Sequence, residues 1–173
     1  MEPGHTQPRS SASNSSKSFS PNRKSSIENR QSKIVIDVGC GSGILSIAAL
    51  KLGARSALGV DIDTDSILNA RENANANSIG DELILGVGSV QEILAGKFPF
   101  GKAPLVVANI LAPVIIRLFD SGLVELVEED GAIILSGILQ EQAQNVIEAA
   151  QVKGLRLNEQ KQIGDWVALT LRR

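Results

Sequence analysis

The sequence contains few of the residues that form cross-links or metal sites. Among 173 residues it has one cysteine and one histidine. The lone Cys40 excludes an internal disulfide and fits a reducing compartment, so a cytoplasmic protein is expected. The only histidine, His5, lies far from Cys40 in the sequence, so neither a Cys–His nucleophile nor a metal site is predicted.

Long apolar runs and a strong charge of one sign are also missing. No stretch of 18 apolar residues occurs, which predicts no membrane-spanning segment. The formal net charge is −2, so the composition demands neither a nucleic acid nor an anionic membrane as partner. Apolar residues still make up 43% of the chain, which is enough for one domain with a full core.

Residues 1–32 differ in composition from the rest. They contain ten serines, five basic residues and two acidic ones, but only four apolar residues. Such a segment cannot bury a core, so we predict a disordered leader over residues 1–32 and a folded domain over residues 33–173. An organelle transit peptide is the less favoured alternative. Five bases and two acids give the leader +3, which leaves −5 on the domain and disfavours nucleic acid as its partner.

The most informative stretch runs from Lys33 to Gly43, where an apolar strand pattern breaks into three alternate glycines before a helix pattern begins at Ile44. A strand, a glycine turn and a helix bring backbone N–H groups against a ligand in α/β proteins. A dinucleotide fingerprint would need its third glycine at the position of Ile44. The observed pattern, D-x-G-x-G-x-G from Asp37, resembles instead the first motif of class I S-adenosylmethionine-dependent methyltransferases.

Four residues of this turn are candidate cofactor contacts. Gly39 and Gly41 let the backbone approach the cofactor closely. Asp37 is expected either to hold the loop or to meet the cationic amino group of the cofactor through water. Cys40 is expected to be a small residue packed under the cofactor, with a catalytic nucleophile as the disfavoured alternative.

The order of strand and helix patterns predicts the fold. Five strand patterns alternate with helix patterns, among them a helix over residues 112–129 and a fifth strand over residues 132–137. Two last strands, over residues 155–162 and 166–171, follow each other without room for a helix. We therefore predict a doubly wound α/β domain with a seven-stranded, mostly parallel sheet and a C-terminal antiparallel hairpin. This ending resembles the class I methyltransferase sheet, where the last strand inserts antiparallel beside its neighbours.

Polar residues at the ends of three other predicted strands extend the site. Asp61 ends the second strand, where a carboxylate can accept both ribose hydroxyls; the alternative is a helix cap, for which Asp63 is better placed. Ser89 lies in the loop expected to meet the adenine ring, with a simple turn as the alternative. Asn109 ends the fourth strand, where its side-chain oxygen could orient a substrate amine toward the methyl group; a helix N-cap is the alternative.

Five segments together resemble the methyltransferases that modify amino groups of protein eleven of the large ribosomal subunit. They begin at Asp37, Gly59, Ala108, Leu135 and Trp166 and read D-V-G-C-G-S-G-I-L-S-I-A-A, G-V-D-I-D, A-N-I-L-A, L-S-G-I-L and W-V-A-L. The resemblance covers roughly residues 33–173. It implies that Gly39, Asp61 and Asn109 are cofactor-site positions, and Ile62, beside Asp61, is grouped with them.

The resemblance implies S-adenosylmethionine as cofactor and N-methylation of a protein, such as a ribosomal protein. It implies neither a bound metal ion nor a membrane as partner. The family also has an N-terminal substrate-binding domain, which the 32 residues before the predicted domain do not resemble. Two other functions stay open. One is methylation of a small molecule or RNA with the same cofactor half; the other is a non-catalytic cofactor-binding relic.

Overall fold

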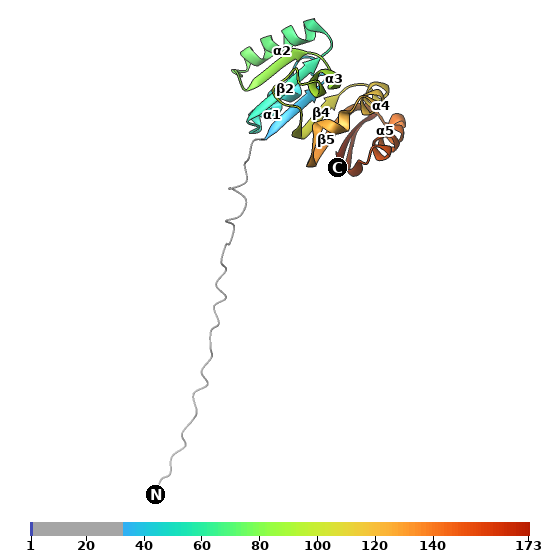
Figure 1. Ribbon diagram of the computed structural model, residues 1–173. Coiled ribbons are helices and arrows are strands. Elements are labelled where there is room, and N and C mark those ends of the chain that lie inside the picture. Colours follow the sequence, from blue (N-terminus) through green and yellow to red (C-terminus); the bar gives the residue numbers. More distant parts are fainter. Residues whose placement is uncertain (2–32) are drawn as a thin grey trace. The chain divides into compact units, whose positions relative to one another are not determined.

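The computed structural model of the protein describes Met1 and residues 33–173 (Figure 1). The predicted disorder of the leader therefore lies outside the described residues. The domain is a seven-stranded sheet in the order β3-β2-β1-β4-β5-β7-β6. The strands are β1 (Ile34–Val38), β2 (Ser56–Asp61), β3 (Leu83–Val87), β4 (Ala103–Asn109), β5 (Val127–Leu139), β6 (Arg156–Ile163) and β7 (Trp166–Arg172).

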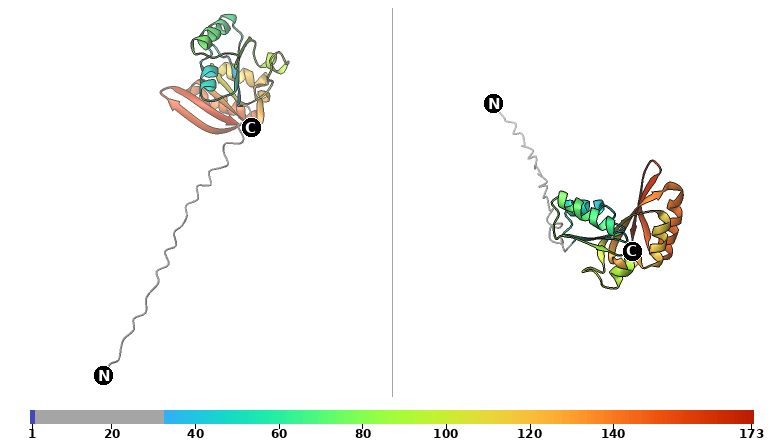
Figure 2. Two further views of the ribbon diagram at one scale, coloured as in Figure 1. Left: turned by 90° about the vertical axis from the view of Figure 1, so that its left-hand side faces the viewer. Right: turned by 90° about the horizontal axis from the view of Figure 1, so that it is seen from above.

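Helices connect the first six strands. They are α1 (Ile44–Lys51), α2 (Thr64–Ala76), α3 (Val90–Leu94), α4 (Ala112–Asp120) and α5 (Gln140–Val152), with a short 3-10 helix η1 (Leu123–Leu126). Strands β1 to β5 pair in parallel, whereas β7 pairs antiparallel with both β5 and β6. The predicted fold class is confirmed, including the last strand between its neighbours. Figure 2 shows the C-terminal hairpin, drawn in red, at one side of the domain.

The sheet separates two hydrophobic cores. Along β1, Val35 faces the core under α1 and α2, whereas Ile36 and Val38 face the larger core under α3, α4 and α5. This run is buried on both faces, as expected for a central parallel strand. On β7 only alternate residues are buried, because α5 packs on one face of the sheet there (Figure 1).

The predicted helix over residues 112–129 was too long. Helix α4 ends at Asp120, and Gly122 has a φ of +96°, a left-handed conformation that stops the helix. The chain then enters η1, and β5 begins at Val127, which pairs with Ala103 of β4. The fifth strand is therefore longer than the predicted range of 132–137.

Candidate functional site

The glycine turn after β1 is fastened to the end of β2. The amides of Gly39 and Cys40 both donate to the carbonyl oxygen of Val60, at 2.8 and 2.9 Å. Gly43 has a φ of +76°, and a Cβ at this position would lie 3.0 Å from the Cβ of Ala70. The glycine therefore permits both the left-handed turn into α1 and close packing of α1 on α2.

Asp61 joins this turn to the loop after β2. One carboxylate oxygen accepts the amide of Gly41 at 2.9 Å, and the other accepts the amide of Asp63 at 3.0 Å. The cap of α2 is Asp63, whose carboxylate accepts the amides of Asp65 and Ser66. Each oxygen of Asp61 keeps a further lone pair, so the carboxylate can still accept ligand hydroxyls.

Asp37 lies beneath the turn and is 1% exposed. Its Oδ2 accepts the amide and the hydroxyl of Ser46, at 3.1 and 2.7 Å, and so holds the first turn of α1. Its Oδ1 is buried and has no hydrogen-bond partner within the described part of the chain. Burial raises the pKa of Asp37 from 3.8 to about 6; the Ser46 hydrogen bonds oppose the rise, and the charge of Asp61 adds to it.

Cys40 is a buried free thiol, 6% exposed. Burial, followed by the charges of Asp37 and Asp61, raises its pKa to about 12. A thiol with this pKa carries almost no thiolate near neutral pH, which disfavours Cys40 as a nucleophile and supports the expected packing role. Its Sγ would lie 3.2 Å from a Cβ at Gly59, where a larger residue would not fit.

A cleft of about 190 Å³ opens at the carboxyl ends of β1 and β2. Four predicted cofactor contacts line it: Gly39, Asp61, Ile62 and Ser89. The Ile62 side chain is 80% exposed at this edge, so it offers a free apolar surface to a ligand. Ser89 is the N-cap of α3 in a capping box: its amide donates to the Glu92 carboxylate at 2.9 Å, and its side-chain oxygen accepts the backbone amide of Glu92. The hydroxyl proton of Ser89 is what remains to be donated to a ligand.

The other predicted site residues lie around this cleft and do not form its walls. Asp37, Cys40 and Gly41 support the turn from below or from the side, and Asn109 lines a second cavity. The residues of the cleft that the sequence did not indicate are apolar or glycine, and their spacing carries no signal for ligand contact. They are Val38, Gly88, Ile110, Val114 and Leu118.

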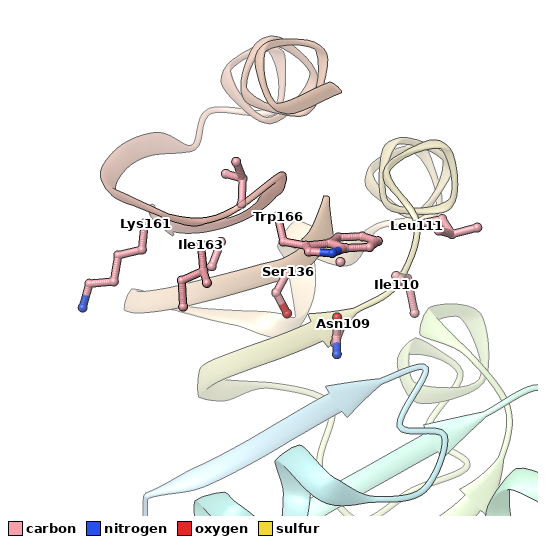
Figure 3. Close-up of a pocket in the computed structure, with 10 residues that line it drawn as sticks. Asn109, Ile110, Leu111, Ser136, Lys161, Ile163 and Trp166 are labelled. Atoms are coloured by element: carbon pink, nitrogen blue, oxygen red, sulfur yellow. The ribbon is translucent and has the colours of Figure 1, made fainter. Parts of the chain in front are cut away.

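The second cavity has a volume of about 610 Å³ and extends from the end of β4 across β5 to the C-terminal hairpin (Figure 3). Its walls are mainly apolar, with Asn109 and Ser136 at one end and Lys161 on β6. In the view of Figure 3 the Trp166 indole lies above the Asn109 amide, and Lys161 extends away at the far side. Trp166 begins one of the five sequence segments that resemble the family, but the sequence does not indicate the direction of its side chain.

Asn109 is exposed in this cavity, and the N-cap of α4 is Leu111. The structure therefore contradicts the alternative that Asn109 is the N-cap of α4. A Cβ at Gly137 would lie 2.8 Å from the Asn109 Oδ1, so this glycine leaves the space that the amide occupies. The side chain is thus available to a molecule in the cavity.

The described residues contain no group of three or more His, Cys, Asp or Glu side chains arranged to hold a metal ion. None of their helices combines the length and the apolar character needed to cross a membrane.

Residues 24–173 match the family described as Ribosomal protein L11 methyltransferase (PrmA). The chain belongs to this family. A ribosomal protein L11 methyltransferase of Mannheimia succiniciproducens is 50% identical over 121 residues, which are 70% of this chain and 39% of that protein. One of Pasteurella multocida is 46% identical over 142 residues, 81% of this chain and 45% of that protein. The chain thus spans about two fifths of the length of these curated relatives.

Solved structures agree with this placement. The ribosomal protein L11 methylase of Lactobacillus delbrueckii subsp. bulgaricus is 38% identical with a TM-score of 0.74, covering 84% of this chain and 72% of that one. A tRNA m1G37 methyltransferase of M. jannaschii is 21% identical with a TM-score of 0.65, covering 82% of this chain and 42% of that one. At this identity the second likeness shows only a shared fold.

The predicted family and the predicted cofactor, S-adenosylmethionine, are confirmed. The residues fit the cofactor in three respects. A carboxylate with free lone pairs, Asp61, lines the cleft, and an exposed apolar side chain, Ile62, lies beside it. The buried Oδ1 of Asp37 has no hydrogen-bond partner among the residues that the structure describes. A buried polar atom of this kind is normally satisfied by a ligand or by an ordered water.

Proposed function

We propose that this chain is an S-adenosylmethionine-dependent methyltransferase that N-methylates amino groups of a protein. Ribosomal protein L11, named in the relatives, is the proposed acceptor. One observation carries the proposal: Asn109 lies in a large apolar cavity that adjoins the cofactor cleft through a shared wall at Ile110. A methyl donor and an amine can therefore meet at the end of β4.

The cofactor would be held mainly by hydrogen bonds and close backbone approach. In this proposal Asp61 accepts the ribose hydroxyls, and Ile62 and Ser89 contact the adenine. Gly39 and Gly41 give the backbone access, and Asp37 receives the cationic amino group through water. When bound, the sulfonium supplies an electrophilic methyl group, so the protein needs neither a metal ion nor a nucleophile.

The acceptor amine must be neutral to react, although a free lysine has a pKa of about 10.4. An apolar cavity disfavours the charged ammonium, and the charged residue among its lining residues, Lys161, is itself a cation. Asn109 would accept a hydrogen bond from the amine and direct its lone pair toward the methyl group. In this proposal the chain contributes an apolar cavity, in which the amine loses its proton to solvent, and alignment of the amine by Asn109.

The deciding experiment is transfer of a radiolabelled methyl group to purified L11, to ribosomal RNA and to a cell extract. Because the chain spans about two fifths of its curated relatives, the acceptor should be tested up to high concentration. Label in L11 that is stable to base, and that Asn109→Ala reduces, is the expected result. Label in RNA alone would transfer the proposal to a nucleic-acid substrate. Tight cofactor binding without transfer to any acceptor would indicate a non-catalytic relic.

The proposed cellular location of this reaction is the cytoplasm. The free thiol of Cys40 is compatible with a reducing compartment, and the proposed acceptor is a ribosomal protein. Fractionation of cells followed by detection of the chain with an antibody tests this location directly.

A further inference from the structure

Ile110 is the one residue that lines both the cofactor cleft and the larger cavity as the structure describes them. The cleft, at about 190 Å³, is smaller than the roughly 300 Å³ at which ordinary small-molecule pockets begin. The donor must therefore extend to the boundary of the cleft, and a group that passes from one space to the other passes the Ile110 side chain. This side chain is half-buried between the two spaces.

The position of Ile110 is fixed from two sides, by β5 and by the glycine turn. Its amide donates to the carbonyl oxygen of Ser136 at 3.2 Å. A Cβ at Gly137 would lie 3.0 Å from the Ile110 carbonyl oxygen and 3.1 Å from its amide nitrogen, so β5 packs tightly on this peptide. On the other side, a Cβ at Gly39 would lie 2.7 Å from the Ile110 Cγ2, so the side chain packs directly on the glycine turn.

A side chain held in this way does not swing freely. Isoleucine is branched at Cβ and has restricted χ1 rotation, and the backbone that carries it is bonded to β5. The two glycines match this arrangement, since each lacks a side chain at the point where Ile110 approaches. Ile110 is therefore a rigid wall with a fixed reach, and it differs from a mobile loop that could widen the passage.

We propose that Ile110 is a specificity-determining residue that limits the size of the group transferred from the sulfonium to one carbon. The inference rests on the proposed methyl transfer. In that step the nitrogen lone pair forms the new N–C bond, and the C–S bond breaks with its electron pair left on sulfur. The proton of the alkylated nitrogen leaves to water. A larger alkyl group would collide with the Ile110 side chain before it reaches Asn109.

The first test is binding, which does not depend on catalysis. Isothermal titration calorimetry with S-adenosylmethionine and with its S-allyl analogue gives a ratio of dissociation constants for each variant. In the parent the analogue should bind at least about tenfold more weakly, because one extra methylene in a fitted apolar pocket is worth about 10- to 200-fold. In Ile110→Ala the ratio should fall at least fivefold, and Ile110→Val should lie between them.

Leu111→Ala is the matched control. Leu111 is the next residue, is also aliphatic, and lines only the larger cavity of the two. It should keep the discrimination of the parent between the two donors, even if it changes acceptor binding. A parent that binds both donors equally would overturn the proposal, as would a ratio in Ile110→Ala that falls less than fivefold. Thermal melting checks that each variant is folded, and Ile110→Val carries the test if Ile110→Ala is not.

The second test is transfer of the allyl group to L11, measured by mass spectrometry against methyl transfer. Ile110→Ala should raise the allyl-to-methyl rate ratio at least tenfold over the parent, whereas Leu111→Ala should not. An unchanged ratio in an active Ile110→Ala enzyme would refute the size limit. If no variant transfers either group to any acceptor but the binding ratios change as expected, the proposed function fails. The binding data would then still support Ile110 as the residue that limits the size of the alkyl group on the sulfonium.

Discussion

The buried carboxylate of Asp37 should make the protein less stable above neutral pH than an uncharged residue would. Folding raises its pKa from 3.8 to about 6, mainly by burial. Between these values the folded state binds more protons than the unfolded chain, so the free energy of unfolding falls as pH rises through this window. Asp37→Asn has nearly the same shape and removes the charge.

The size of the effect follows from the two pKa values. Their separation, 3.8 to about 6, corresponds to about 3 kcal/mol at 1.36 kcal/mol per pKa unit. About 2 kcal/mol of this should develop between pH 4 and pH 7. The amide oxygen of the variant can still accept the amide and hydroxyl of Ser46, but its NH₂ group gains no partner, which costs about 1–3 kcal/mol at every pH.

The pH dependence therefore separates the charge from the mispaired amide. Urea unfolding of the parent and of Asp37→Asn at several pH values gives the difference in free energy, which should move by about 2 kcal/mol in favour of the variant between pH 4 and pH 7. Ser46→Ala, which removes one hydrogen bond to the carboxylate, should steepen the pH dependence of the parent. A pH-independent difference between the parent and Asp37→Asn would refute the assignment of a buried, uncompensated charge.

Four further predictions concern three residues of the site and the N-terminal segment. Asp61→Ala should weaken cofactor binding by about 1.5–3 kcal/mol, because hydrogen bonds to a charged group are lost; an unchanged dissociation constant in calorimetry would contradict this. Asn109→Ala should lower turnover by about tenfold to a hundredfold, about 1.4–2.7 kcal/mol, with a smaller change in cofactor affinity. Ser136→Ala, in the same cavity, is its control, and normal turnover at saturating cofactor would reject the aligning role. Cys40 should resist iodoacetamide at pH 8 until the protein unfolds, given its pKa of about 12; rapid labelling of the native protein would disprove its burial. Removal of residues 1–32 should leave the melting temperature of the domain unchanged, since their composition supports no core; a clear drop would show that they pack on it.

The elements that local sequence patterns encode were predicted well. An apolar run that breaks into alternate glycines located β1, and apolar runs ending in polar residues located β2 and β4. The short link between the last two runs indicated the hairpin of β6 and β7. These features depend on side chains close together in the chain, and so they can be read without knowledge of long-range contacts.

The end of α4 and the start of β5 were not predicted, because both depend on distant residues. Leu123–Leu126 continues the helical pattern, and only the left-handed Gly122 breaks it. Val127 becomes a strand residue through its pairing with Ala103, which is remote in sequence. A local pattern carries no information on such a pairing.

The same limit applies to the site. The sequence indicated Asp61 as a ligand residue, but its hydrogen bonds to Gly41 and to the loop after β2 became visible only in the structure. The proposed role of Ile110 depends on two glycines that approach it, Gly39 in the turn after β1 and Gly137 in β5. Its aliphatic side chain is indistinguishable in sequence from an ordinary core residue.

The position of β7 has a consequence for how the protein is made. This strand is the last of the seven in chain order, yet it lies inside the sheet, and β6 reaches β5 only through it. During synthesis β5 therefore keeps an open edge, with unpaired backbone groups that can recruit other chains, until β7 has emerged. A premature stop codon that removes the seven residues of β7 would leave that edge open permanently, and β6 would have no neighbour in the sheet to pair with.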